Sequence, residues 1–154
     1  MGSGRNLSYY PQEFQVTAID FSEGMLKLAR EKATGQKAAG RLLLMDVQNL
    51  GFQDNTFDTV VASLVFCSVP DPLRGLREVA RVVKPGGKIL LLEHVLSTNR
   101  FWAWIMNSIN PLTLAIFGDN INRKTAENVA GSGLVLEKVT DLSGIFKLIE
   151  ARKG

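Results

Sequence analysis

Short apolar runs that end at an acidic residue alternate with amphipathic helical segments along this chain. The run at 14–20 ends in Asp20, and the Leu-rich run at 41–45 is followed at once by Asp46. Between them, apolar residues recur at helical spacing after Ser22, a residue type that caps helices. This alternation favours a parallel sheet covered by helices, and the nearly all-Leu run predicts a strand buried on both faces.

The same alternation continues through the rest of the chain. Further strands are predicted at 56–65, 88–95, 134–139 and 145–151. Further helices are predicted from Asp71–Pro72 to the turn Pro85–Gly87, over 101–117 in two pieces, and over 122–131. The predicted fold class is α/β, with a Rossmann-like, doubly wound, mostly parallel sheet that has an antiparallel C-terminal edge. We expect residues 1–154 to form a single domain, because a chain of this length can bury one core.

Composition and charge exclude several classes of protein. Hydrophobic residues make up 45% and charged residues 21% of the chain, which is typical of a globular protein. The single cysteine, Cys67, leaves no disulfide framework and no cysteine-rich zinc site, so we expect a cytoplasmic protein without a metal. A net charge of +3 without a long basic run argues against nucleic acid. We also expect neither a signal peptide nor a membrane span.

Polar residues and glycines at the expected strand ends predict a nucleotide-type site. Gly2 and Gly4 would let the backbone approach a ligand closely, although a flexible terminus or a tag remnant has the same composition. Asp20 can accept hydrogen bonds from both hydroxyls of a ribose, or it can cap the following helix. Asp46 can accept a hydrogen bond from an exocyclic amine, or it can lie in a surface turn.

Several segments in a fixed order strengthen this interpretation. The segments are 17–26, 45–52, 55–58 and 76–87, with 2–11 in front of them. Together they resemble class I S-adenosylmethionine-dependent methyltransferases, of the methyltransferase type 11 and phospholipid N-methyltransferase-like kind. The segment at 2–11 is similar to the second half of the glycine-rich loop of that family. The resemblance implies S-adenosyl-L-methionine as cofactor and methyl transfer as the reaction.

The resemblance also implies a role for each matching residue in binding the cofactor. Gly2 and Gly4 would line its methionine end, and Asp20 would hold the ribose. The adenine would be contacted by Phe21, Met25, Asp46 and Val47. Ser63 and Leu64 would lie beside the sulfonium and its methyl group.

Candidate residues for catalysis and for the methyl acceptor lie around the expected strand ends. His94, the only histidine, ends the fourth predicted strand and is the first candidate for a proton acceptor, with Tyr9 as the second. Tyr10, Trp102 and Arg123 are candidates for contacting the substrate. Three of these residues have an ordinary alternative: a structural role for His94, core packing for Trp102 and an exposed charge for Arg123.

The sequence leaves more than one candidate for the methyl acceptor. The segment 118–125 resembles bacterial phospholipid N-methyltransferases, which favours an amine of the phosphatidylethanolamine type. Segments 67–70 and 93–95 resemble membrane-associated proteins that methylate thiols, and quinone C-methyltransferases share the general framework. A non-catalytic cofactor-binding or interaction domain is the alternative from another class.

One part of the family pattern has no counterpart in this sequence. The strand that normally precedes the glycine-rich loop, together with its covering helices, is not matched, so the sheet would have an empty central position. There are three explanations. The start of the chain is truncated or misassigned, the protein is a minimal form that repacks or borrows an element from a second copy, or it is a degenerate paralogue. We expect a homodimer with 101–117 as its apolar surface, and a peripheral membrane contact as a further option.

Overall fold

The computed structural model describes residues 1–33, 40–94, 108, 125–143 and 146–154. Within it the chain divides into two compact units, Met1–Gly51 and Phe52–Gly154, each with a sheet of its own. Trp102 and Arg123 lie outside the described residues, as does nearly all of the predicted helical segment 101–117.

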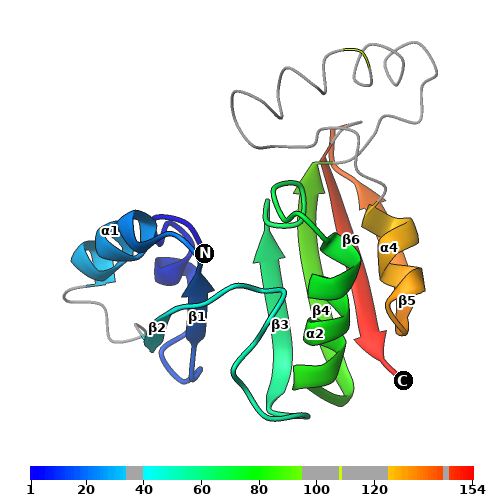
Figure 1. Ribbon diagram of the computed structural model, residues 1–154, viewed down its shortest axis with the longest axis horizontal. Helices are drawn as coiled ribbons and strands as arrows, with labels where there is room; N and C mark the ends of the chain where they lie inside the picture. Colours follow the sequence, from blue (N-terminus) through cyan, green and yellow to red (C-terminus); the bar gives the residue numbers. More distant parts are fainter. Residues whose placement is uncertain (34–39, 95–107, 109–124, 144–145) are drawn as a thin grey trace. The chain divides into compact units, whose positions relative to one another are not determined.

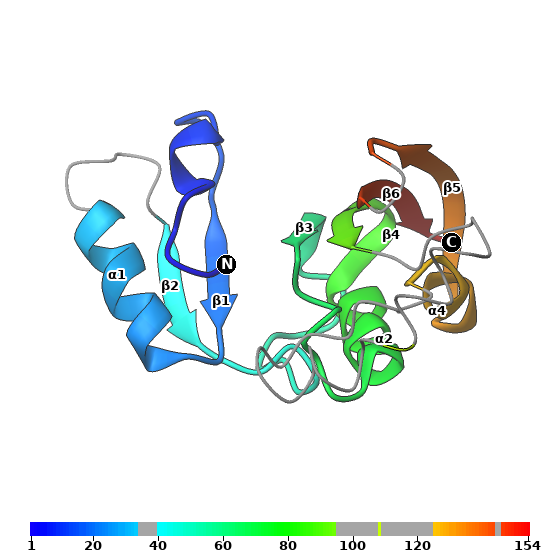
Figure 2. The ribbon, with the colours of Figure 1, turned by 90° about the horizontal axis from the view of Figure 1, so that it is seen from above.

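The first unit is built on two parallel strands and one helix. Strand β1 (Thr17–Asp20) pairs in register with β2 (Arg41–Leu44), and α1 (Glu23–Ala33) connects them. In Figure 2, α1 lies along the pair of strands. A short 3-10 turn, η1 (Leu7–Tyr9), precedes β1.

Capping and a narrow apolar stripe explain where α1 begins and how it packs. The Ser22 hydroxyl accepts a hydrogen bond from Met25 N at 3.4 Å, which confirms Ser22 as the predicted cap. Leu26 and Ala29, three residues apart on one face, are fully buried, and Leu7 of η1 is buried as well. Burial of a leucine side chain of this kind stabilises a fold by about 1.5–3 kcal/mol.

Two sequence predictions in this unit are wrong in detail. The strand predicted from Phe14 begins only at Thr17, because Phe14 lies in a turn in which its N–H donates to Pro11 O at 3.1 Å. The Leu-rich strand β2 is not buried on both faces: its last residue, Leu44, is 57% exposed. Among the described strands β2 pairs with β1 alone, so a run of leucines occurs in a strand with little cover.

The second unit contains a four-stranded sheet with the order β3–β4–β6–β5. Its strands are β3 (Phe57–Ser63), β4 (Val83–His94), β5 (Leu134–Asp141) and β6 (Phe146–Lys153). The β3–β4 pair is parallel, whereas β6 runs antiparallel to both β4 and β5. The predicted antiparallel C-terminal edge is therefore confirmed (Figure 1).

Two helices cover one face of this sheet. Helix α2 (Pro72–Val82) and helix α4 (Thr125–Gly131) lie on the same side of it in Figure 2 and pack against each other. The core between helices and sheet consists of side chains that are at most 4% exposed. They are Leu76, Val79, Val82, Val83, Ile89, Leu91, Val129, Leu134, Ile149 and Ala151.

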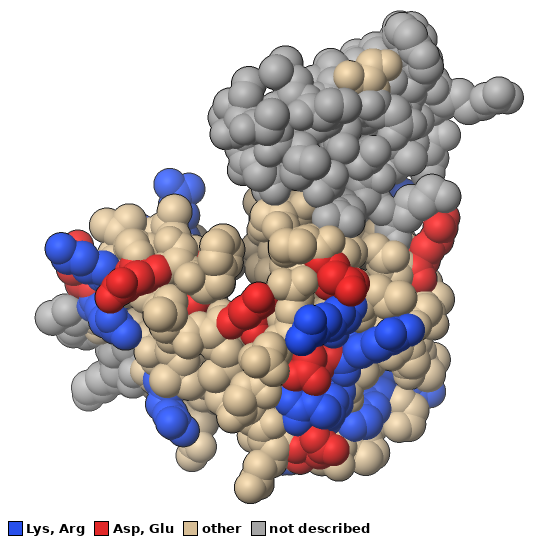
Figure 3. Space-filling model, in the orientation of Figure 1, with Lys and Arg blue, Asp and Glu red and all other residues tan. Residues whose placement is uncertain are grey.

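Helix α2 begins where the sequence predicts. The Asp71 carboxylate accepts a hydrogen bond from Arg74 N at 3.0 Å, and Pro72 occupies the first helical position. Arg74 and Arg77 are exposed on its outer face. Figure 3 shows basic and acidic side chains interspersed on the face that α2 covers.

The turn Pro85–Gly87 differs from its predicted role as the end of that helix. The helix ends at Val82, because Val83 already has an extended backbone with φ −77° and ψ 140°. Strand β4 then runs from Val83 through the glycines, with a shift of register against β3. Gly86 has a φ of +73°, a left-handed conformation that glycine adopts without strain.

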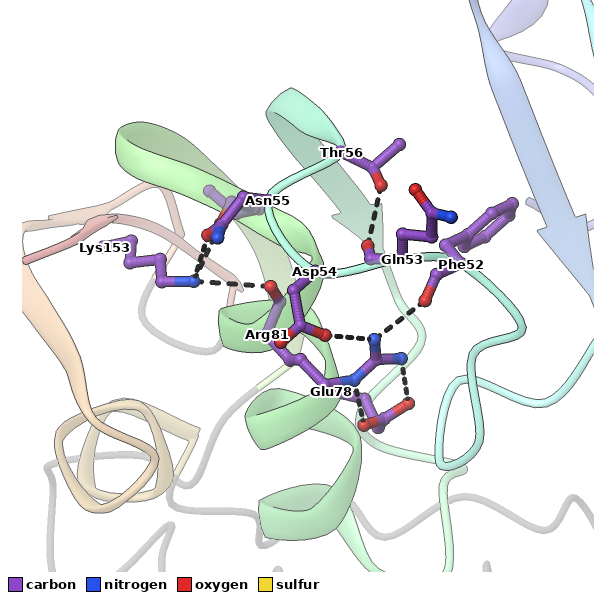
Figure 4. A network of polar contacts seen from close by, with 9 residues as sticks. Phe52, Gln53, Asp54, Asn55, Thr56, Glu78, Arg81 and Lys153 are labelled. Carbon is purple, nitrogen blue, oxygen red and sulfur yellow. Dashed lines mark hydrogen bonds and ion pairs between the residues drawn. The ribbon is translucent and has the colours of Figure 1, made fainter.

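A polar network joins α2 to the chain that leads into β3 (Figure 4). The Arg81 guanidinium donates to both carboxylate oxygens of Glu78, each at 2.8 Å, and to Phe52 O at 2.7 Å and Asp54 Oδ1 at 2.8 Å. Hydrogen bonds to Glu78 first, and then to Asp54, hold the pKa of Arg81 above its ordinary value. The planar fork of arginine suits this arrangement, which lysine cannot reproduce.

Lysine 153 extends the network to the last strand. Its ammonium donates to Asn55 Oδ1 at 2.8 Å and to the carbonyl oxygens of Val83 and Arg81 at 3.0 and 3.3 Å. The C-terminal strand β6 is thereby tied to the junction between α2 and β4.

We expect Gly87→Ala to destabilise the protein. A Cβ atom at Gly87 would lie 2.6 Å from Val83 Cγ1, 2.8 Å from Lys84 O and 2.9 Å from Asp58 O. Two of these neighbours are backbone atoms, so relief requires a shift of the strand, and the free energy of unfolding should fall by about 1–3 kcal/mol. Urea unfolding measures it.

Gly131→Ala is the matched control in the same unit. A Cβ atom there meets only Leu73 Cδ1, at an ordinary 3.6 Å, so stability should stay the same or rise by up to about 1 kcal/mol. Equal unfolding curves for Gly87→Ala and the unmutated protein would contradict the packing described at Gly87.

Candidate functional site

Asp20 and Asp46 lie at the same edge of the two-stranded sheet. Asp20 is the last residue of β1 and is in register with Leu44, the last residue of β2. Met45 N donates to Asp20 O at 3.0 Å, and Asp46 follows one residue later. The structure therefore brings these two predicted site residues to the carboxyl ends of adjacent parallel strands, where open α/β sheets bind ligands.

Among the described residues, three nitrogen atoms donate hydrogen bonds to the carboxylate of Asp20. Oδ2 accepts from Gly2 N at 2.7 Å and from the Met1 amino group at 3.2 Å, while Oδ1 accepts from Ser22 N at 2.9 Å. The side chain is only 12% exposed. Burial raises the pKa of Asp20, but the hydrogen bonds from Ser22 and Gly2 and the charge of the amino terminus outweigh burial, so the pKa lies below its ordinary value.

This arrangement leaves room for one further donor on Asp20. A carboxylate offers about four lone-pair positions, and the three N–H donors use three of them. The remaining position on Oδ1 suits a ribose hydroxyl, whereas a second hydroxyl on Oδ2 requires one nitrogen donor to give way. The chemistry of Asp20 thus fits the predicted role of holding a ribose.

Asp46 forms a local turn rather than a buried contact. Its carboxylate accepts from Gln48 N at 2.8 Å and from the Gln48 side-chain amide at 2.9 and 3.2 Å, and its carbonyl accepts from Asn49 N. Both the turn and an exposed carboxylate are present, so the two predicted roles of Asp46 do not exclude each other. Val47, between the two residues, is half-buried.

The two glycines of the predicted loop have different surroundings. Gly2 has a φ of +60°, and a Cβ atom there would meet nothing within 4 Å. Gly4 has a φ of +76° and is buried, with a Cβ atom predicted to lie 3.1 Å from Ala29 and from Leu7. The left-handed backbone and the tight space beside α1 both favour glycine at position 4, while Gly2 contacts Asp20 directly.

Two large apolar side chains beside Asp20 are open to solvent. Phe21 is 76% exposed and Met25, one helical turn further on, is 44% exposed. Aromatic and thioether groups next to a polar anchor are the kind of surface that covers a flat ring. The exposure of Phe21 and Met25 is compatible with their expected place near an adenine, and this role stays a prediction.

Ser63 and Leu64 lie at the end of β3 in the second unit. Leu64 N continues the strand ladder by donating to Leu92 O at 2.8 Å. Leu64 then has a φ of +54°, a left-handed conformation that is costly for a branched side chain, and it is 48% exposed. Such strain is found where a chain segment is held in one shape by its surroundings.

The candidate residues for catalysis and substrate contact that the structure describes belong to different units, with Tyr9 and Tyr10 in the first and His94 in the second. Tyr9 ends η1 with an exposed fraction of 83%, and Tyr10 is half-buried, with burial raising its pKa. The backbone of His94 is the last of β4 and is in register with Phe146, while its side chain lies outside the described part. The roles of Tyr9, Tyr10 and His94 stay predictions.

Glu93 has no role of its own in the sequence pattern. In the structure it is fully buried in β4 and accepts hydrogen bonds from the backbone of the segment after β3. An available signal was a single acid at the end of the apolar run 89–92, since a lone carboxylate in a buried strand needs partners. In the described ranges no group of acidic, cysteine or histidine side chains is suited to a metal ion, and no helix is long and apolar enough to span a membrane.

Parallel strands with acids and tight turns at their carboxyl ends define the class of the protein. It has a Rossmann-like α/β fold with the polar edge that this fold uses for nucleotide-type cofactors.

Comparison with known proteins makes the assignment more specific. Residues 1–91 match the family model described as "Methyltransferase domain". Phosphatidylethanolamine N-methyltransferase of Cereibacter sphaeroides is 43% identical over 96 residues, which are 61% of this chain and 47% of that protein. Demethylmenaquinone methyltransferase of Lactiplantibacillus plantarum is 36% identical over 109 residues, 67% of this chain and 46% of that protein.

A solved structure has the same fold. A SAM-dependent methyltransferase from Methanosarcina mazei superposes with a TM-score of 0.74 at 23% identity, over 99% of this chain and 88% of that one. This chain spans about half the length of the two curated relatives named above. It belongs to the methyltransferase domain family and has the fold of class I S-adenosylmethionine-dependent methyltransferases, which indicates S-adenosyl-L-methionine as the cofactor.

Asp20→Asn should lower stability in a pH-dependent way. Because the pKa of Asp20 is depressed in the folded chain, the charged carboxylate stabilises the fold above the ordinary value of 3.8, and this stabilisation is lost as the pH falls through the lower folded value. The difference in unfolding free energy between the unmutated protein and Asp20→Asn should be largest near neutral pH and shrink in acid. Urea unfolding at several pH values measures it.

Ser22→Ala is the control, because Asp20 accepts from the backbone N–H of Ser22 and not from its hydroxyl. This variant loses a helix cap and should lower stability by a similar amount at every pH. If the unfolding free energy changes with pH in acid in the same way for Asp20→Asn and for the unmutated protein, the depressed pKa of Asp20 is contradicted.

Proposed function

We propose that this protein transfers a methyl group from S-adenosylmethionine to a lipid-like or small acceptor, with an amine of the phosphatidylethanolamine type as the first candidate. The observation that carries the proposal is the Asp20 carboxylate. It ends a parallel strand, is held in place by backbone N–H groups, and keeps an acceptor position for a ribose hydroxyl.

Residues of both units are proposed for the other contacts of the cofactor site. Gly2 presents a backbone that can be approached closely, and Phe21 and Met25 offer apolar cover for an adenine. Asp46 and Val47 would read the adenine edge, with Gly4 shaping the loop. Ser63 and Leu64 would lie at the methyl-bearing end. When bound, S-adenosylmethionine supplies a methyl group already activated by a sulfonium.

The identity of the methyl acceptor is supported by the names of relatives and is the more specific part of the proposal. One relative is a phosphatidylethanolamine N-methyltransferase and another a demethylmenaquinone methyltransferase, at 43% and 36% identity. A quinone carbon is therefore the second candidate. The resemblance of segment 118–125 to phospholipid N-methyltransferases favours the amine. A thiol is a further candidate, from the resemblance of segments 67–70 and 93–95.

The chain has two tasks in such a reaction. It must hold the acceptor in line with the methyl carbon at about 3–3.5 Å, and it must remove a proton from an amine or a quinol. His94, at the carboxyl end of β4, and Tyr9 are the proposed proton acceptors. Tyr10, Trp102 and Arg123 are proposed to contact the acceptor, with Arg123 suited to a phosphate.

Several wider properties belong to the same proposal. A lipid-like acceptor implies contact with a membrane surface from outside it, and we propose a cytoplasmic, membrane-peripheral protein that acts as a homodimer. Gel filtration with light scattering measures the dimer directly.

Binding of S-adenosylmethionine, measured by isothermal titration, tests the cofactor site. We expect the unmutated protein to bind and Asp20→Ala to bind roughly 10–100-fold more weakly, because a charge-assisted hydrogen bond to the ribose is lost. Asp58→Ala is the control, since the Asp58 carboxylate pairs with Lys84 on the surface of the second unit. Folded protein that does not bind at millimolar concentration would contradict the proposal.

Transfer of a labelled methyl group identifies the acceptor. Vesicles with phosphatidylethanolamine, demethylmenaquinone in detergent, and a small thiol are presented in parallel, each with the Asp20→Ala variant as control. Label in the phospholipid supports the first candidate, and label in the quinone supports the second. Binding without transfer to any acceptor would favour a non-catalytic cofactor-binding domain.

A further inference from the structure

A buried carboxylate outside the proposed ribose site holds the chain that follows β3. Glu93 lies in β4 with an exposed fraction of 0%. Its Oε1 atom accepts two backbone hydrogen bonds, from Val65 N at 3.0 Å and from Phe66 N at 3.1 Å. The two donors are consecutive, and both belong to the segment directly after β3.

The position of this carboxylate follows from how the strand ladder ends. Ser63 is the last residue of β3, and Leu64 N still donates to Leu92 O at 2.8 Å. The left-handed backbone of Leu64, with a φ of +54°, then turns the chain away from β4. The next two N–H groups leave the ladder, and the Glu93 side chain accepts them in place of a strand carbonyl.

The segment that Glu93 holds is compact. Ser68 donates to Val65 O from both its N–H, at 3.1 Å, and its hydroxyl, at 3.0 Å. Phe66 is fully buried and Cys67 is 5% exposed. Burial on one side and the carboxylate on the other hold residues 64–68 in one conformation, which explains how the strained Leu64 is maintained.

A fully buried acidic side chain is an expensive way to hold a turn. Removing a carboxylate from water is costly unless strong bonds compensate it, and an apolar residue would pack a purely structural strand end at lower cost. Consecutive N–H groups bonded to a carboxylate form stronger bonds than those to a neutral carbonyl and define a segment more sharply. Precise placement of the segment is what this choice of residue provides.

We propose that Glu93 is a positioning residue for the methyl-donor site: it fixes residues 64–68 so that the end of β3 has the shape that binds the donor. The inference rests on the proposed function, in which Ser63 and Leu64 lie beside the methyl-bearing end of the cofactor. Glu93 acts through the backbone of Val65 and Phe66.

Two Glu93 variants and one control test this role. Glu93→Gln keeps the size and one carbonyl oxygen but replaces the carboxyl group with an amide, and Glu93→Leu removes the acceptors altogether. Ile89→Val is the control, because Ile89 is a fully buried residue of the same strand whose partners in register are Val60 and Ala151. Thermal unfolding of all three shows whether differences in stability explain the result.

Hydrogen exchange and binding are the two measurements. In Glu93→Gln the N–H groups of Val65 and Phe66 should exchange about tenfold faster, and the Kd for S-adenosylmethionine should rise about tenfold. Glu93→Leu should show larger changes in both, and Ile89→Val neither. If Glu93→Leu does not fold, Glu93→Gln still decides the question.

Each outcome supports or overturns the role of Glu93. Unchanged donor binding in Glu93→Gln, or equal weakening in Ile89→Val, would overturn it. If the unmutated protein itself does not bind the donor, the proposed function fails and the positioning role fails with it. That failure is recognised in the unmutated protein alone, whereas failure of the Glu93 role appears only as a lack of difference between variants.

Discussion

Backbone N–H groups that leave a parallel strand at its carboxyl end need acceptors, and in this protein buried carboxylates supply them. Asp20 accepts from Ser22 N directly after β1, and Glu93 accepts from Val65 N and Phe66 N after β3. Asp20 also accepts from Gly2 N of the loop that precedes β1. The turns at the ends of these strands depend on the two side chains. A carboxylate serves this purpose well, because its bonds to N–H groups are stronger than those of a carbonyl.

The same bonds connect stability with function. At Asp20, the donors that lower its pKa also orient the carboxylate toward one remaining acceptor position, so the fold prepares the group that is proposed to hold a ribose. At Glu93, the bonds stabilise a strained backbone at Leu64. Both carboxyl groups lie near the carboxyl ends of parallel strands, the region where sheets of this kind bind ligands.

Local features could be predicted from the sequence, and features that depend on neighbours could not. Asp71 and Pro72 predict the start of α2 correctly, because a cap and a fixed φ act within one turn. The prediction that β2 is buried on both faces is wrong, because a run of leucines does not specify how many strands and helices cover it. The sequence pattern predicts that α2 ends at the turn Pro85–Gly87, but the helix ends at Val82, because pairing with β3 extends β4 back to Val83.

For the candidate site the division is similar. The sequence by itself determined the family pattern, the alternation of strands and helices, and the acid at the end of β1, because each depends on residues close together in the chain. Only the tertiary structure decided the partners of Glu93, which are 27 and 28 residues away, and the depressed pKa of Asp20, whose donor Gly2 is 18 residues distant. Such contacts form when strands align, and no local pattern of residue types specifies which N–H group a buried carboxylate will meet.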